Sequence, residues 1–150
     1  MAANRSELIR ACRDYLQTKI MVVRKAMDSL KEDMENESKS SAGDKFETGR
    51  EMINIEWNKL SVQLNEYDRL GQILNRIEEH KPNGNIILGS MVITDIAKYF
   101  ISIPAGEIKS DDEKYYAVGI KAPIAQMLLG KKVGDKITFN GKECIIEDIN

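Results

Sequence analysis

Residues 16–34 read LQTKIMVVRKAMDSLKEDM, and their apolar side chains recur at steps of four, three, four, three and four. The members of this first stripe are Leu16, Ile20, Val23, Met27, Leu30 and Met34. A second stripe of similar spacing consists of Ile53, Trp57, Leu60, Leu64, Tyr67 and Leu74. Such spacing keeps apolar side chains on one face of a helix, so the sequence predicts two long amphipathic helices.

Residues 36–43, NESKSSAG, separate the two stripes, and they are small, polar and poor in helix formers. They therefore predict a turn, and two amphipathic helices joined by a short turn predict an antiparallel helical hairpin. Each helix would have roughly 32 residues and a length of about 48 Å. The stripes alone are equally compatible with a coiled-coil dimerisation arm, although the turn favours pairing within one chain.

The chain changes character near residues 80 to 85, where Lys81-Pro82-Asn83-Gly84 predicts a turn and strand-forming residues become frequent. About five strands are predicted, at residues 85–94 (with Gly89 as a bulge), 98–103, 115–118, 136–139 and 143–147. Residues 123–130 predict a short helix that has proline near its start and glycine at its end. Asn140-Gly141 predicts a type I′ turn between the last two strands.

The fold class predicted from these patterns is α+β with two domains. Residues 1–80 would form the antiparallel hairpin, a coiled coil with its tip near residues 36–47. Residues 81–150 would form a small antiparallel β domain with one short helix.

Composition narrows the classes of partner. Of 150 residues, 31% are charged and 42% are hydrophobic, and the net charge is −2. That balance argues for weak or no binding of free DNA and favours a protein partner. The sequence has neither a long apolar run nor the pattern of a secretory signal, so we expect a cytoplasmic protein without a membrane partner. Cys12 and Cys144 lack metal-site spacing and are predicted to be buried apolar side chains.

Two segments of the second half resemble the C-terminal domain of the Gre transcript-cleavage factors, which act on bacterial RNA polymerase. Residues 83–92, NGNIILGSMV, are similar to the opening pattern of that domain. Residues 123–135, PIAQMLLGKKVGD, match its Pro-Ile-Ala, Leu-Gly-Lys and Gly-Asp signature in order and spacing. Gre factors also carry an N-terminal hairpin whose tip holds Gly-Asp-x-x-Glu, and residues 43–47 here read GDKFE. The resemblance spans nearly the whole chain and implies an FKBP-like second domain.

The resemblance implies a transcription elongation factor that is not an enzyme by itself. The hairpin would enter the secondary channel of bacterial RNA polymerase, near the 3′ end of the nascent RNA. There Asp44 and Glu47 would assist the polymerase's second Mg²⁺ in cleaving backtracked transcripts. The isolated protein would be a monomer and would hold no metal or cofactor. Docking on the polymerase would involve signature residues, namely Pro123, Ile124, Ala125, Leu129, Gly130 and Lys131.

Two alternatives remain open at the tip. Asp44-x-x-Glu47 is also the pattern of a capping box at a helix start. The tip departs from the family as well, because Lys45 and Phe46 invert the usual order and residues 48–51 read TGRE where the family has Asn-Ala-Glu-Tyr. Lys45 and Arg50 are candidate RNA contacts or members of a solvated face. These departures motivate an alternative function, a Gre-like regulator or inhibitor that occupies the channel without stimulating cleavage.

Overall fold

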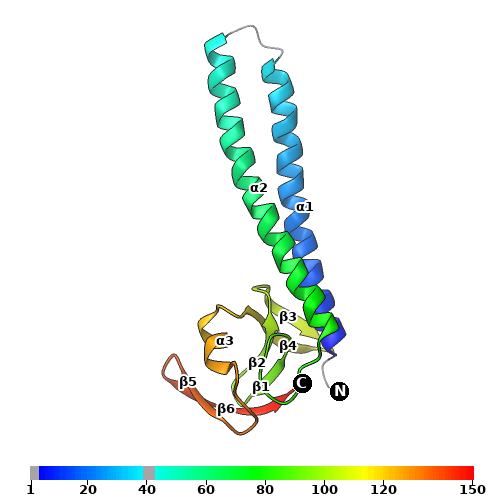
Figure 1. Ribbon diagram of the computed structural model, residues 1–150, viewed down its shortest axis with the longest axis vertical. Helices are drawn as coiled ribbons and strands as arrows, with labels where there is room; N and C mark the ends of the chain where they lie inside the picture. The colour runs from blue at the N-terminus through cyan, green and yellow to red at the C-terminus, as the bar shows by residue number, and fades with distance from the viewer. Residues whose placement is uncertain (1–3, 39–42) are drawn as a thin grey trace. The chain divides into compact units, whose positions relative to one another are not determined.

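A computed structural model describes residues 4–38 and 43–150, with side chains described for residues 4–36 and 49–150 (Figure 1). Two long helices come first, α1 (Arg5–Ser38) and α2 (Gly43–Glu79). Four strands follow, β1 (Met91–Thr94), β2 (Lys98–Ser102), β3 (Gly106–Ser110) and β4 (Glu113–Gly119). The short helix α3 (Pro123–Leu128) precedes β5 (Lys136–Phe139) and β6 (Lys142–Ile149). The chain is α+β, with two helices followed by a mostly antiparallel sheet.

The chain divides into two compact units, and the division falls within the long helices. One unit, the hairpin unit, is Leu16–Arg69. The other, the sheet unit, combines all six strands and α3 with the first turns of α1, up to Tyr15, and the last turns of α2, from Leu70. The base of the hairpin is therefore part of the same compact unit as the sheet.

Within the hairpin unit, α1 and α2 run side by side in opposite directions (Figure 1). The two predicted stripes are confirmed, since their members there are buried or half-buried, except Trp57, which is 37% exposed. The helices have 34 and 37 residues, longer than predicted. The predicted turn at 36–43 is wrong at both ends, because α1 continues through Ser38 and α2 begins at Gly43. Residues 39–42 lie outside the described part of the chain.

The six strands form one sheet in the order β3-β4-β2-β1-β6-β5. Neighbouring strands are antiparallel, except that β4 pairs with β2 in parallel, with Tyr99 opposite Tyr116. After β2 the chain skips one position in the sheet to form β3, and β4 then returns to fill the position between β3 and β2. Because β4 is antiparallel to β3, it runs parallel to β2. The predicted turn between β5 and β6 is confirmed, with φ of 52° at Asn140 and 77° at Gly141.

Both faces of the sheet carry buried side chains. Helix α3 packs over one face, where the core cluster consists of Ile86, Val92, Ile101, Ile124, Ala125, Leu128, Ile137, Cys144 and Ile146. Alternate strand residues point to the opposite face, where Phe100 and Ser102 are buried. The Ser102 hydroxyl lies 3.8 Å from the Cys12 sulfur of α1, so the base of the hairpin covers this second face. Both cysteines are buried, as the sequence predicted.

Strand β3 was missed by the sequence analysis, which placed a polar loop before residues 115–118. Residues 106–110, GEIKS, look unlike a strand in sequence because Ile108 is their one large apolar side chain. In the structure only Ile108 and Ser110 of this strand are buried. Asp111 and Asp112 have φ of 49° and 65°, the conformation of a tight hairpin turn that joins β3 to β4. Charged side chains on a short edge strand hinder pairing with other chains, and they also hide the strand from pattern analysis.

Gly89 is not a strand bulge, which corrects the sequence analysis. It lies in a turn before β1, and the register shift of β1 occurs instead between Ile93 and Thr94, opposite β6. Gly89 has φ of +96°, and a Cβ built on it would lie 2.8 Å from Arg5 Nη2 and 3.3 Å from Ile77 Cγ2. Glycine is therefore required here both by the backbone conformation and by the close approach of the hairpin base.

Candidate functional site

The acidic pair of the tip lies at the beginning of α2. The helix starts at Gly43, so Asp44 and Glu47 both have helical backbone, and a spacing of three residues sets them on one side of the first turns. A capping box would instead need Asp44 to precede the first helical residue. Carboxylates in a first turn interact favourably with the helix dipole. The side chains of Asp44, Lys45 and Glu47 lie outside the described residues, and Arg50 is exposed.

The signature segment 123–135 has clear structural roles in the sheet unit. Pro123 is the first residue of α3, where a missing amide hydrogen costs nothing. Ile124 and Ala125 are buried in the core, and Leu129 packs against it. Of the six candidate docking residues, Pro123, Gly130 and Lys131 are exposed. Among these six candidates, a partner would therefore contact mainly these three residues.

The two segments that carry the Gre resemblance are hydrogen-bonded to each other. The Gly130 amide donates to the Ile86 carbonyl at 2.8 Å, and the Ile86 amide donates to the Lys131 carbonyl at 2.9 Å. Gly130 lies two residues after α3 and has φ of +82°, a conformation that other residues adopt at a cost. The pattern of residues 83–92 and that of residues 123–135 therefore describe one local structure.

The end of the signature forms a second fixed turn. The Asp135 carboxylate accepts a hydrogen bond from the Lys132 amide at 2.9 Å. The Gly134 amide donates to the Ile146 carbonyl at 2.7 Å, and the Ile146 amide donates to the Asp135 carbonyl at 2.9 Å. The Gly-Asp pair thus attaches the loop after α3 to β6.

A small apolar hollow of about 160 Å³ lies beside α3 and the β5–β6 hairpin. It is lined by Ile96, Tyr99, Ile124, Phe139, Asn140, Lys142 and Cys144. Burial raises the pKa of both the Cys144 thiol and the Tyr99 phenol. Both groups therefore stay protonated at neutral pH, and neither is activated as a nucleophile or base. The hollow is suited to binding an apolar side chain rather than to catalysis.

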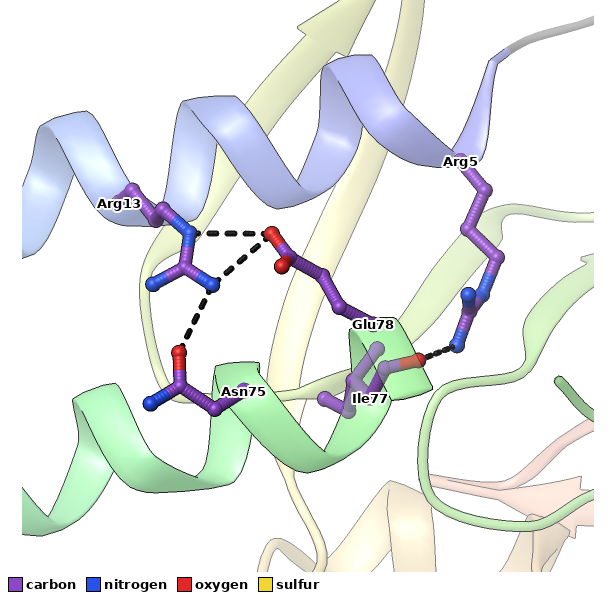
Figure 2. A network of polar contacts seen from close by, with 5 residues as sticks. All are labelled: Arg5, Arg13, Asn75, Ile77 and Glu78. Atoms are coloured by element: carbon purple, nitrogen blue, oxygen red, sulfur yellow. Dashed lines mark hydrogen bonds and ion pairs between the residues drawn. The ribbon is translucent and has the colours of Figure 1, made fainter. Parts of the chain in front are cut away.

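Arg5 occupies the joint between the hairpin base and the sheet, a role that the sequence analysis missed. Its guanidinium donates to the Gly89 carbonyl at 3.1 Å and to the His80 carbonyl at 3.3 Å. It also donates to the Ile77 carbonyl (Figure 2). The Ile77 and His80 carbonyls lie at the end of α2, where the helix itself supplies no partner. A single arginine near the N-terminus gives no signal in sequence, because its partners are backbone atoms far along the chain.

A second arginine joins the two helices near Arg5. Arg13 Nη2 lies 2.8 Å from Glu78 Oε1 and donates to Asn75 Oδ1 at 3.0 Å (Figure 2). The Ser110 hydroxyl of β3 donates to the Glu7 carboxylate at 2.7 Å and accepts from the Asn4 backbone amide at 3.0 Å. These polar contacts join the bases of the two helices to each other and the start of α1 to β3.

No family model matches the chain, and no curated protein matches it. Over the residues that the structure describes, no group of three His, Cys, Asp or Glu side chains is arranged to hold a metal ion. None of the described helices is both long and apolar enough to cross a membrane.

Proposed function

We propose that this protein is a Gre-type transcription elongation factor that binds bacterial RNA polymerase and stimulates cleavage of backtracked transcripts. The observation that carries the proposal is the acidic pair Asp44 and Glu47 at the start of the second helix of a long hairpin. The hairpin is followed by a domain in which the two Gre-like segments are joined by backbone hydrogen bonds of Ile86 with Gly130 and Lys131. The FKBP-like assignment of the sheet unit belongs to the same proposal, supported by α3 on one face of a mostly antiparallel sheet.

The chemistry of the tip follows from the needs of phosphodiester hydrolysis. Cleavage by two metals requires a second ion about 3.5–4 Å from the first, to orient and activate the attacking water. Mg²⁺ in such sites is held by one or two carboxylates, with waters and phosphate oxygens completing its shell. Asp44 and Glu47 would supply these carboxylates from the hairpin tip inside the secondary channel. Lys45 and Arg50 would lie near the phosphates at the 3′ end of the RNA.

The hairpin unit suits this task because it is long and thin. A pair of helices with a narrow apolar seam has no room for a ligand of its own, so it acts by entering a partner. The polymerase supplies the catalytic site and the tightly bound metal, and this protein supplies carboxylates. The exposed residues Pro123, Gly130 and Lys131 would contribute to docking outside the channel.

The proposal is tested by transcript cleavage in stalled elongation complexes of the cognate polymerase. We expect the wild-type protein to accelerate cleavage and the Asp44→Ala/Glu47→Ala variant to lose that effect while still binding. A matched control is Glu32→Ala/Glu35→Ala, which removes two carboxylates of the same spacing from α1. Unchanged cleavage with the tip variant, or equal loss with the control, would show that the tip pair has no specific role.

A second candidate function is a channel-binding regulator that does not stimulate cleavage. The residues after Glu47 favour it, because Gly49 lies within the helical backbone of α2, where glycine costs about 1 kcal/mol relative to alanine. A less firmly held tip would position the carboxylates poorly. In the same assay this candidate predicts binding to stalled complexes with no gain of cleavage. Strengthening the start of α2 with Gly49→Ala would then increase any residual cleavage.

A further inference from the structure

The hairpin unit carries a second apolar stripe, on a face of α2 that does not pack against α1. Met52, Ile55 and Val62 are 67%, 62% and 68% exposed, and Lys59 occupies the position between the last two. Steps of three, four and three residues place these four side chains on one face of the helix. Single exposed apolar residues are ordinary, but a stripe of them on one face indicates an interaction surface.

The stripe borders a shallow hollow. Its volume is about 360 Å³, and its lining consists of Glu56, Lys59, Leu60, Val62 and Gln63. A hollow formed by residues of successive helical turns is the kind of site that receives one side chain from a facing helix. The face therefore offers both projecting apolar side chains and a place to receive them.

We propose that this face of α2 binds the same face of a second copy of the chain, with the two α2 helices antiparallel. The spacing of three, four and three reads the same in both directions. A two-fold axis on this face, at the level of residue 57 along the helix, then sets Met52 of each copy opposite Val62 of the other, and Ile55 opposite Lys59. Such a self-complementary patch is what a two-fold interface requires.

The charges of this face select the antiparallel arrangement. Glu56 and Lys59 form no ion pair with any other residue that the structure describes. Across the two-fold axis, Glu56 of each copy lies near Lys59 of the other, which gives two symmetric pairs of opposite charge. A parallel pairing would instead set Glu56 against Glu56 and Lys59 against Lys59, and like charges disfavour it.

The association would be weak and reversible. Three apolar side chains from each copy fall short of the roughly 800 Å² that each partner buries in a stable interface. The protein would thus be monomeric when dilute and would pair as its concentration rises. Pairing hides the outward face of α2, so it adds to the proposed function a self-associated form in which that face is unavailable to other partners.

The test is sedimentation equilibrium of the full chain over a wide concentration range. The wild type should rise from a mass of 17.0 kDa toward twice that value. Val62→Glu should remain at the monomer mass. Val22→Glu is the matched control, since it makes the same change at a 63% exposed valine of α1, and it should leave the association intact. Unchanged circular dichroism would confirm that both variants fold.

Charge variants test the arrangement itself. Glu56→Lys and Lys59→Glu should each weaken association on the order of fivefold, and the double variant should restore it, because opposite charges again face each other. The proposal is overturned by a monomer at every concentration, by an equal effect of Val22→Glu, or by a double variant that fails to restore pairing. A monomeric protein whose Val62→Glu variant binds polymerase less tightly would assign the face to polymerase instead.

Discussion

The two units of the chain are stabilised differently, although the same pair of helices passes through both. In the hairpin unit, among the described side chains, only Leu16 and Val23 are fully buried apolar residues. In the sheet unit every strand contributes a buried apolar side chain, and the helix base adds Leu8, Cys12 and Leu74. A narrow seam leaves most of the hairpin surface free for contacts with other molecules. The free energy of folding is therefore concentrated in the sheet unit.

Truncating one leucine in each unit gives the largest expected contrast. Leu128 is fully buried in the core cluster, whereas Leu64 is a half-buried member of the hairpin seam. Leu128→Ala should lower the free energy of unfolding by about 2–5 kcal/mol, because it removes buried carbon atoms and leaves a cavity. Leu64→Ala should cost about 1 kcal/mol, since much of that side chain is already exposed to water. Urea unfolding followed by circular dichroism measures both, and equal losses would contradict the contrast.

A substitution at Gly89 tests how closely the hairpin base packs against the sheet. Gly89→Ala should destabilise the protein by about 1–2 kcal/mol for its positive φ, and by about 1–3 kcal/mol more for the clash with Arg5 and Ile77. Gly84→Ala is the matched control, because Gly84 has a similar φ of +86° but no atom within 4 Å of an added Cβ. Equal losses in thermal or urea unfolding would mean that the helix base does not press on Gly89.

Sequence patterns predicted most of the fold because they report local periodicity and turn chemistry. The stripes predicted both helices, Asn140-Gly141 predicted the β5–β6 turn, and proline and glycine bounded α3. They did not reveal β3, whose charged edge residues resemble a loop. The role of Arg5 was also hidden, because its acceptors are backbone carbonyls more than seventy positions away.

The candidate site also combines features that the sequence predicts with features that only the folded structure reveals. A short apolar segment can indicate that Ile124 and Ala125 are buried by ordinary packing. It does not distinguish a residue of the core from a residue that docks on a partner. The hydrogen bonds between residue 86 and residues 130–131 depend on tertiary folding, so no spacing along the chain predicts them. The outward stripe of Met52, Ile55 and Val62 was readable from its spacing, but the stronger packed stripe on the same helix obscured it.

Arginine substitutions at the joint should give a smaller effect than the glycine change. Arg5→Met removes the donor to three backbone carbonyls, of which those of Ile77 and Gly89 are part-buried, and should cost about 1–3 kcal/mol. Arg13→Met breaks an exposed ion pair with Glu78 and should cost about 1 kcal/mol or less. Both variants replace arginine with methionine. The difference between their free energies of unfolding in urea therefore reports how much more stabilising the partly buried contacts of Arg5 are than the exposed contacts of Arg13. A larger loss of stability for Arg13→Met would mean that the contact between the two helices matters more than the contacts of Arg5.

Alkaline pH should weaken the sheet unit through Cys12, by less than the changes at Leu128, Gly89 and Arg5. Burial raises the pKa of the Cys12 thiol to about 11, from an ordinary value of 9.0, and the bond to Ser102 opposes this only in part. In the unfolded chain the thiol therefore loses its proton first. The stabilisation is complete below pH 9 and declines as the pH rises from 9 toward 11, because ionisation then favours the unfolded state.

The expected loss attributable to this thiol by pH 10.5 is on the order of 1–2 kcal/mol. Tyrosines and lysines titrate in the same range, so the informative quantity is the difference between the wild type and Cys12→Ala across pH 8 to 10.5. The cavity left by the substitution shifts stability by a constant amount, whereas loss of the thiol flattens the pH dependence. The hairpin unit contains no cysteine, so a thiol-linked slope reports on the sheet unit alone. Identical slopes for the two proteins would mean that water reaches Cys12 and that the hairpin base covers the sheet less tightly than its contacts indicate.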